Sequence, residues 1–301
     1  MHDVTIAVVT YNSERFVRDC IGSLLAHSPK DFSTQIVVVD NASQDRTVAI
    51  LKEEFPSITL IESSENLGFG RGNNLAMENA PARYYYLHNA DAYLQGDSLN
   101  AALHILEHEQ EIGIAGLPLV FPDQSPQTGA YGFTTPAKWL LQGLGVRHFA
   151  KWVATSDQAK WLRAPLSRIS MAQTYIRTHS SAAAPLEHSV DVDWVCGASL
   201  ILREQVRQDL NGGFDPDIFL YGEDEDMCIR AQQSGWRVAQ VPATPVIHEF
   251  GWGSSGKSSP VVSRLKADSL KVFINKHFKN GSPKWLAMRA MLWVQKKRWG
   301  V

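Results

Sequence analysis

The chain has 301 residues, 44% of them hydrophobic and 20% charged, which is the composition of a globular protein with one large domain and a buried core. Its formal net charge of −2 excludes a protein that coats nucleic acid, and it offers neither a signal-peptide pattern nor about 20 consecutive apolar residues. Its three cysteines show no metal-ligand spacing and suit a reducing compartment, so we expect a cytoplasmic protein that crosses no membrane.

Apolar runs alternate with helix-like segments from the start of the chain. The runs TIAVVT, QIVVVD, ITLIES and YYYLHN each precede a segment of helical character, at residues 13–27, 45–54, 71–79 and 98–108. Repetition of strand and helix at this spacing predicts a parallel sheet covered by helices on both faces. We therefore expect residues 1–120 to form the nucleotide-binding half of an α/β domain.

Polar residues follow these predicted strands. Open parallel sheets bind ligands at the carboxyl ends of their strands, so the residues that leave each strand are candidate binding residues. They are Thr10, Tyr11, Asn12, Asp40, Asn41, Asn66, Asn89, Ala90 and Asp91. Asp91 taken alone fits a turn aspartate as well as a ligand.

The stretch ENLGFGRGNNLA, residues 65–76, follows the third predicted strand. Its glycines do not match a dinucleotide fingerprint, but they allow a ligand to approach the backbone at a helix start. We therefore add Gly68, Phe69 and Asn73 to the candidate donor-binding residues.

Residues 124–190 differ from the rest of the chain. Between residues 137 and 179 there are seven Lys or Arg residues and one acid, Asp157, and strand-like runs are missing. We expect a helical insert here. Strand-like sequence returns with DVDWVCGASLILRE, so residues 191–258 are expected to form the second, catalytic and acceptor-binding half.

Four acids, Glu223 to Asp226, stand together in FLYGEDEDMCIR. Acids in a first helical turn complement the helix dipole, which is a structural explanation for Glu225 and Asp226. Crowded carboxylates also raise one another's pKa, and this makes a carboxylate a usable base near neutral pH. Farther on, His248 ends a predicted strand. It is either a structural histidine or a metal ligand beside phosphates.

In this order, these stretches resemble inverting family 2 glycosyltransferases of the GT-A fold, in particular their rhamnosyltransferase-like branch. The motifs, which span residues 4–258 apart from the insert, are VVTYNSERFV, VVVDNASQDRT, ENLGFGRGNNLA, LHNADAYL, WVCGASLILRE, FDPDIFLYGEDEDMCIR and HEFGWGSSGKS. The resemblance implies an α/β, Rossmann-like, mostly parallel central sheet with flanking helices. A helical insert and C-terminal helices would complete it, with a GT-A domain at 1–258 and a basic helical tail at 259–301.

The resemblance also implies roles for single residues. Asn89-Ala90-Asp91 corresponds to the D-x-D motif with Asn in place of the first Asp, so Asp91 would bind the metal, and His248 matches the third metal ligand. Glu223 and Asp224 match the acid pair whose second member is the general base, and Asp40 falls where the nucleobase is recognised. The implied cofactor is Mg²⁺ or Mn²⁺. The donor would be dTDP-L-rhamnose, or otherwise a UDP- or dTDP-hexose, and the acceptor a hydroxyl of a bacterial cell-surface glycan or lipid-linked saccharide.

The stretch GWGSSGKS, residues 251–258, matches the P-loop pattern G-x-x-x-x-G-K-S. A P-loop needs later strands to supply the acid that holds Mg²⁺, and only 43 residues follow Ser258, with no apolar run that ends in Asp. We interpret the match as accidental and expect Lys257 to fold over the donor diphosphate. The alternatives are a P-loop NTPase that uses residues 251–258, and a non-catalytic carbohydrate-binding protein.

From Arg264 to the end there are ten Lys or Arg residues and one acid, Asp268. Trp285, Trp293 and Trp299 lie among them, and the apolar stretch is too short to span a bilayer. Two interpretations follow: the tail packs on the catalytic domain as a terminal helix, or it lies on an anionic membrane surface. The second would make the protein peripheral on the inner face of the cell membrane.

Overall fold

The core of the fold is an eight-stranded sheet, seen in a computed structural model that describes residues 2–143, 158, 186–249 and 260–301. The strand order is β10-β13-β6-β12-β4-β1-β2-β3. Only β12 and β10 run antiparallel to their neighbours, so the sheet is mostly parallel, as predicted. The strands are β1 (His2–Thr10), β2 (Thr34–Asp40), β3 (Thr59–Glu62), β4 (Ala82–Asn89), β6 (Ile112–Gly116), β10 (Val190–Asp191), β12 (Ser199–Arg203) and β13 (Arg237–Gln240).

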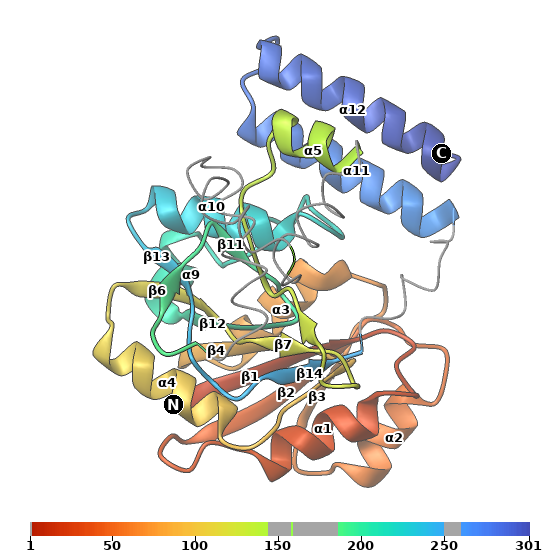
Figure 1. The fold of residues 1–301 in the computed structure, drawn as a ribbon. Coiled ribbons are helices and arrows are strands. Elements are labelled where there is room, and N and C mark those ends of the chain that lie inside the picture. The colour runs from red at the N-terminus through yellow and green to blue at the C-terminus, as the bar shows by residue number, and fades with distance from the viewer. Residues whose placement is uncertain (1, 144–157, 159–185, 250–259) are drawn as a thin grey trace.

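Helices cover both faces of this sheet, because successive side chains of a buried strand point to opposite sides. In β1, Ile6 and Val8 belong to one hydrophobic cluster and Ala7 to another. The first cluster packs under α1 (Val17–Ala26), α2 (Thr47–Glu54) and α4 (Ser98–His108), and the second under α3 (Gly68–Asn79), α9 (Glu204–Asp209) and α10 (Glu223–Gln233). Figure 1 shows these two helical layers with the sheet between them.

Two small sheets extend the fold at the carboxyl end of the central sheet. One has the order β5-β14-β7-β8, and the other pairs β11 with β9. Their strands are β5 (Ala92–Tyr93), β7 (Leu119–Val120), β8 (Pro126–Gln127), β9 (Ala130–Tyr131), β11 (Trp194–Val195) and β14 (Val246–His248).

The expectation that residues 124–190 lack strands was wrong, because β8, β9 and the start of β10 lie there. Strands of two residues are too short to show any periodicity in the sequence. A helix, α5 (Pro136–Gly143), does begin in this segment, and of the residues that follow up to 185 only residue 158 is described. The domain boundaries at 120, 190 and 258 stay predictions.

The C-terminal part forms a helical hairpin of α11 (Pro260–His277) and α12 (Pro283–Trp299). Ser282 caps α12 by accepting a hydrogen bond from the backbone N–H of Trp285. Ala267, Ile274, Met288 and Leu292 form a small core between the two helices. In Figure 1 the hairpin lies at the top, beyond α10 and next to α5. Among the described residues, no helix has both the length and the apolar character needed to cross a bilayer.

Candidate active site

The loops that leave β1 and β2 are tied together by Asp40. Its Oδ1 accepts hydrogen bonds from the hydroxyls of Thr10 (2.8 Å) and Ser43 (2.6 Å), and its Oδ2 accepts one from the backbone N–H of Ser43 (2.8 Å). Asn12, at φ +50°, donates its backbone N–H to the Ser43 hydroxyl, and Tyr11 is 48% exposed. The buried Asp40 carboxylate therefore holds the loops at the carboxyl ends of β1 and β2, which form the rim of the candidate site. The contact of Asp40 with a nucleobase stays a prediction.

The glycines after β3 serve protein packing. Gly68 has φ +79°, and a Cβ added there would lie 2.5 Å from the carbonyl oxygen of Phe219. A Cβ added at Gly70 would lie 2.9 Å from Phe214, and one at Gly72 would lie 2.9 Å from Val9. The sequence led us to expect a ligand close to the backbone of these glycines. In the structure, Phe219, Phe214 and Val9 of the protein lie close to them.

Three further candidates lie beside these glycines. Asn66 accepts a hydrogen bond from the N–H of Gly68 (2.9 Å), and the ring of Phe69 packs edge-on against Phe214. Asn73 is buried, and its amide donates to the carbonyl of Phe69 (3.0 Å). Its Oδ1 has no hydrogen-bond partner within the described part of the chain. A buried acceptor of this kind is available to a ligand donor.

The two predicted metal ligands meet across the small sheet. Asp91 follows the end of β4, and His248 ends β14, whose register places it opposite Ala92. The Nε2 atom of His248 lies 3.3 Å from Oδ1 of Asp91 and 3.4 Å from Nδ2 of Asn89. Asn89 and His248, which are 159 positions apart in the sequence, are thereby brought together beside Asp91.

Behind His248 lies Gln127, a residue that the sequence did not point to. The Oε1 atom of Gln127 is 2.8 Å from Nδ1 of the buried His248, and as an amide oxygen it accepts a hydrogen bond from the Nδ1–H group. In a neutral histidine with its proton on Nδ1, Nε2 carries the lone pair that a metal ion would bind, beside the Asp91 carboxylate. Two electron-rich atoms 3.3 Å apart suit a cation between them, and a carbonyl behind a ligating histidine is the usual support of a metal site. The residues therefore fit a divalent ion.

The acid pair lies at the start of α10. Helix α10 begins at Glu223, after two residues in the left-handed region, Tyr221 (φ +69°) and Gly222 (φ +101°). Asp224 accepts hydrogen bonds from the N–H groups of Gly197 (3.2 Å) and Glu225 (2.9 Å). Burial raises the pKa of Asp224 to about 6, and burial together with the Asp224 charge raises the pKa of Glu223.

The other two acids differ from each other. Burial raises the pKa of Glu225 to about 7, although Glu225 accepts a hydrogen bond from the hydroxyl of Thr134 (2.7 Å). Burial acts in the same sense on Asp226, but a hydrogen bond from His277 and the charges of Arg230 and Lys276 bring its pKa down to about 2. Our prediction of raised pKa values through crowding was therefore wrong for Asp226. For Glu223 and Glu225 it named a lesser cause than burial, and at Asp224 burial is the cause that raises the pKa.

The metal pair and the acid pair share one neighbourhood. The backbone N–H of Gly197 donates to Asp224 (3.2 Å), and the carbonyl of the next residue, Ala198, accepts the backbone N–H of Asn89 beside the metal pair (3.0 Å). Within the described ranges, no group of three or more His, Cys, Asp and Glu side chains could hold a metal ion. An ion on Asp91 and His248 would thus complete its shell with other oxygens, which suits Mg²⁺ or Mn²⁺ on a diphosphate. Lys257 lies outside the described residues.

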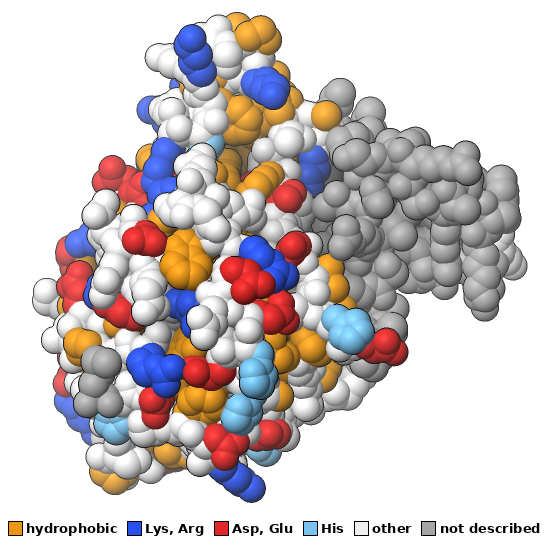
Figure 2. All heavy atoms as spheres, turned by 90° about the vertical axis from the view of Figure 1, so that its left-hand side faces the viewer, with side chains coloured by type: hydrophobic (Ala, Val, Ile, Leu, Met, Phe, Trp, Pro, Cys, Tyr) orange, Lys and Arg blue, Asp and Glu red, His pale blue; other side chains and the backbone are white. Residues whose placement is uncertain are grey.

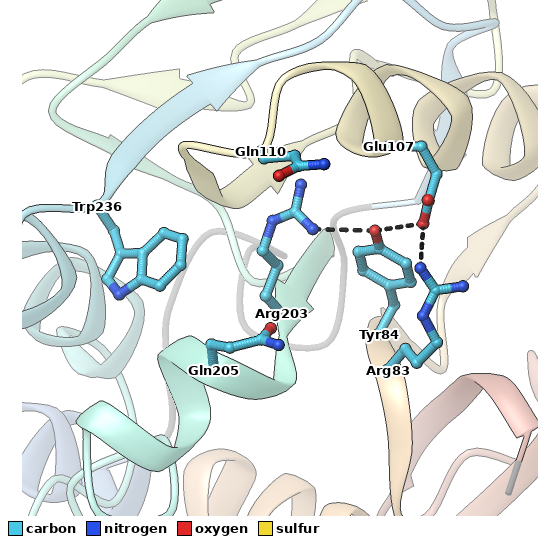
Figure 3. A pocket seen from close by; sticks show the side chains of 7 residues that line it. All are labelled: Arg83, Tyr84, Glu107, Gln110, Arg203, Gln205 and Trp236. Carbon is cyan, nitrogen blue, oxygen red and sulfur yellow. Dashed lines mark hydrogen bonds and ion pairs between the residues drawn. The ribbon is translucent and has the colours of Figure 1, made fainter.

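A pocket of about 340 Å³ lies at the opposite, amino-terminal end of the parallel strands. Figure 3 shows its lining, with the guanidinium of Arg203 in the middle and Trp236 to one side. Arg203 donates to the carbonyl of Ile112 (2.7 Å) and the hydroxyl of Tyr84 (2.9 Å), and Glu107 pairs with Arg83. These groups satisfy one another and contain none of the predicted site residues, so this pocket is not the candidate active site.

Comparison with known proteins points to sugar transfer. Residues 5–156 match the model of the family described as glycosyl transferase family 2. The N-acetylglucosaminyl-diphospho-decaprenol L-rhamnosyltransferase of Mycobacterium tuberculosis is 22% identical over 254 residues, which are 81% of this chain and 75% of that protein. The poly(ribitol-phosphate) beta-N-acetylglucosaminyltransferase TarS of Staphylococcus aureus is 28% identical over 116 residues, or 37% of this chain and only 20% of TarS.

Solved structures share the fold. A mannosyltransferase from Pyrobaculum calidifontis, in complex with GDP-Man and Mn²⁺, superimposes with a TM-score of 0.59 at 17% identity, over 99% of this chain and 72% of that one. Residues 1–349 of Staphylococcus aureus TarS give a TM-score of 0.53 at 14% identity, over 98% and 72% of the two chains. These neighbours are GT-A glycosyltransferases, so the predicted fold class is confirmed.

Proposed function

The chain belongs to glycosyl transferase family 2, and from this premise we propose that it moves a sugar from a nucleotide-sugar donor to an acceptor hydroxyl with inversion at the anomeric carbon. The observation that carries the proposal is the rim where Asp224, an aspartate of raised pKa, shares a neighbourhood with the facing pair of Asp91 and His248. A P-loop NTPase or a non-catalytic carbohydrate-binding protein would leave this arrangement without a purpose.

Asp224 acts as the general base in this proposal. As the acceptor oxygen attacks the anomeric carbon, the carboxylate takes the hydroxyl proton, and the bond from that carbon to the diphosphate oxygen breaks. Glu223 lies beside it with a raised pKa and one buried oxygen that has no partner in the described part of the chain. A divalent ion held by Asp91 and His248 would act as a Lewis acid toward the leaving diphosphate, a contribution of several kcal/mol.

We propose dTDP-L-rhamnose as the donor, with a UDP- or dTDP-hexose as the alternative. The Mycobacterium tuberculosis relative, which matches 81% of this chain, is named as an N-acetylglucosaminyl-diphospho-decaprenol L-rhamnosyltransferase. That name supports both this donor and a lipid-linked or glycan acceptor. The donor would lie along the rim formed by Thr10, Tyr11, Asn12, Asp40, Asn66, Gly68, Phe69, Asn73, Asn89 and Ala90, with Lys257 over its diphosphate.

The test is incubation with a panel of sugar nucleotides, with Mn²⁺, with Mg²⁺ and with a chelator. We expect metal-dependent release of nucleoside diphosphate from one donor and no hydrolysis of ATP. ATP hydrolysis that is lost on Lys257→Ala would instead restore the P-loop interpretation. Absence of release from every donor, in a protein that binds saccharides, would favour the carbohydrate-binding alternative.

A lipid-linked acceptor brings the enzyme to a membrane, and we propose that α12 supplies the contact. Leu286, Ala290, Trp293 and Lys297 follow one another at helical spacing and are all exposed, with Leu286 at 56% and Trp293 at 62%. The opposite side of α12, with Met288, packs on α11. Figure 2 shows hydrophobic and basic side chains together at the top of the molecule, where the hairpin lies. An apolar strip flanked by cations suits an anionic lipid surface.

A groove between α11 and α12 supports the same proposal. It has a volume of about 280 Å³, and its lining includes Lys271, Arg289, Lys296 and Lys297. Each basic residue near an anionic surface contributes about 1 kcal/mol. Leu286→Ser should therefore reduce flotation with phosphatidylglycerol vesicles at low salt. Leu25→Ser is the matched control, since Leu25 is a 44% exposed leucine on α1, at the other end of the molecule. Equal flotation of both variants would remove α12 from the proposal.

A further inference from the structure

The C-terminal helix α11 lies along the segment that carries the acid pair. Its residues Lys266, Ser269, Phe273, Lys276 and His277 recur at helical spacing and so share one face. Each of them contacts the segment from Asp215 to Asp226. This face is distinct from the one that packs on α12, where Ala267 and Ile274 lie.

The strongest contact is a buried ion cluster at Asp226. This carboxylate is completely buried, and its Oδ2 accepts a hydrogen bond from Nε of Arg230 on the same helix (2.8 Å). Its Oδ1 lies 2.8 Å from Nζ of Lys276 and 2.7 Å from Nε2 of His277, both on α11. Lys276 also pairs with Asp215, at the start of the segment. A buried carboxylate that loses its partners must find water or move, so α11 fixes where the first turn of α10 lies.

A second set of contacts holds the turn before that helix. Tyr221 and Gly222 are both in the left-handed region, which is strained for a tyrosine and persists only where its surroundings enforce it. The hydroxyl of Ser269 accepts the backbone N–H of Leu220 (3.0 Å), and Nζ of Lys266 lies 4.1 Å from the centre of the Tyr221 ring. A Cβ added at Gly222 would lie 3.6 Å from the Phe273 ring. Helix α11 therefore contacts all three residues of the turn, Leu220, Tyr221 and Gly222.

We propose that α11 is a positioning element for sugar transfer, and that Lys276 and His277 act through Asp226 to hold Asp224 in line with the acceptor hydroxyl. The inference rests on the proposed function, in which Asp224 is the base. Asp224 and Asp226 are both in the first turn of α10, so a displacement of one moves the other. The basic C-terminal part is on this view a component of the catalytic centre.

The test compares Lys276→Met with Lys276→Arg and with Arg264→Met, which removes an equal charge from an exposed position of α11. We expect Lys276→Met to lower kcat by about tenfold to hundredfold, as a misplaced catalytic group does. The donor KM and the dissociation constant of the nucleoside diphosphate with Mn²⁺ should stay unchanged. Lys276→Arg should restore turnover, and Arg264→Met should equal the wild type.

A double-mutant cycle separates positioning from simple stability. If Lys276 acts through Asp226, then Lys276→Met adds little to kcat loss in an Asp226→Asn background, because no buried charge is left to pair. That background also allows measurement if Lys276→Met does not fold. Wild-type kcat in folded Lys276→Met, or additive losses in the double variant, would overturn the proposal. Either result would leave the proposed function intact, because that function is tested separately by the panel of donors and by the turnover of Asp224→Asn.

Discussion

Replacement of Asp224 by Asn removes the proposed base while it keeps the size of the side chain. Both hydrogen bonds that Asp224 accepts come from backbone N–H groups, Gly197 and Glu225, and one of them can still be accepted by the amide oxygen. A positioned general base contributes about 10²- to 10⁴-fold in rate. We therefore expect Asp224→Asn to lose this factor in kcat and to bind the donor as the wild type does.

The pH dependence of the wild type follows from the same carboxylate. Burial raises the pKa of Asp224 from 3.8 to about 6, so the base is ionised above that pH and protonated below it. The kcat of the wild type should fall as the pH drops through about 6. Asp224→Asn should lose this limb of the profile, because the group that titrates is gone.

Stability should change in the opposite direction to activity. A carboxylate whose pKa is higher in the folded state than in the unfolded state stabilises the fold only while it is protonated, so its contribution is lost as the pH rises from about 4 to about 6. The rise of the pKa from 3.8 to about 6 corresponds to at most about 3 kcal/mol of stability, and to less for this partly exposed side chain. Asp224→Asn should thus raise the Tm at mildly alkaline pH.

The assay pairs initial rates of nucleoside diphosphate release with thermal unfolding, each measured across pH for wild type and Asp224→Asn. An inactive variant with intact donor binding and a raised Tm agrees with a catalytic base whose pKa is raised in the folded protein. Near wild-type turnover in the variant would refute the role of Asp224. A lowered Tm of Asp224→Asn at alkaline pH would refute the inference that burial sets the pKa of Asp224 and that no ion pair compensates for it.

Two further predictions concern the metal pair and the packing of the rim. In calorimetry, Asp91→Asn and His248→Ala should each abolish the enhancement of nucleoside diphosphate binding by Mn²⁺. Gln127→Leu, behind the histidine, should weaken the binding of Mn²⁺ by about tenfold to hundredfold. An unchanged enhancement in any of these variants would show that the residue does not serve the metal site. Gly68→Ala should lower the free energy of unfolding by about 1–3 kcal/mol, because its φ of +79° and the Phe219 carbonyl exclude a Cβ. Gly22→Ala, a helical position with nothing within 4 Å, should leave stability the same or higher.

The strand–helix alternation of the first 108 residues could be read from the sequence because it depends on local periodicity. Each of the four predicted apolar runs lies on β1, β2, β3 or β4, and each helix follows within a few residues of its predicted start. Asp91 and His248 were paired in advance through the resemblance and through their positions at strand ends. Their meeting is made by the antiparallel pairing of β14 with β5, which places His248 opposite Ala92, and no local pattern of the sequence marks that pairing.

Other features depend on packing between distant segments. Strand β12 lies antiparallel between β4 and β6, and its partners are more than 80 positions away in the sequence. Gln127 supports His248 from 121 positions away, and His277 reaches Asp226 across 51. No local pattern marks these contacts, because each depends on where two separate elements come to rest.

The acid segment GEDED shows most clearly what the sequence determines and what depends on the tertiary structure. Its sequence determined that four carboxylates stand at the start of a helix, where a base is useful. The tertiary structure decided which of them keep a raised pKa: burial without a cation raises it at Asp224, and the Lys276 and His277 side chains of α11 lower it at Asp226. Composition fixes which groups can titrate, but desolvation and the distance to a counter-charge decide where they do, and both arise only when the chain is folded.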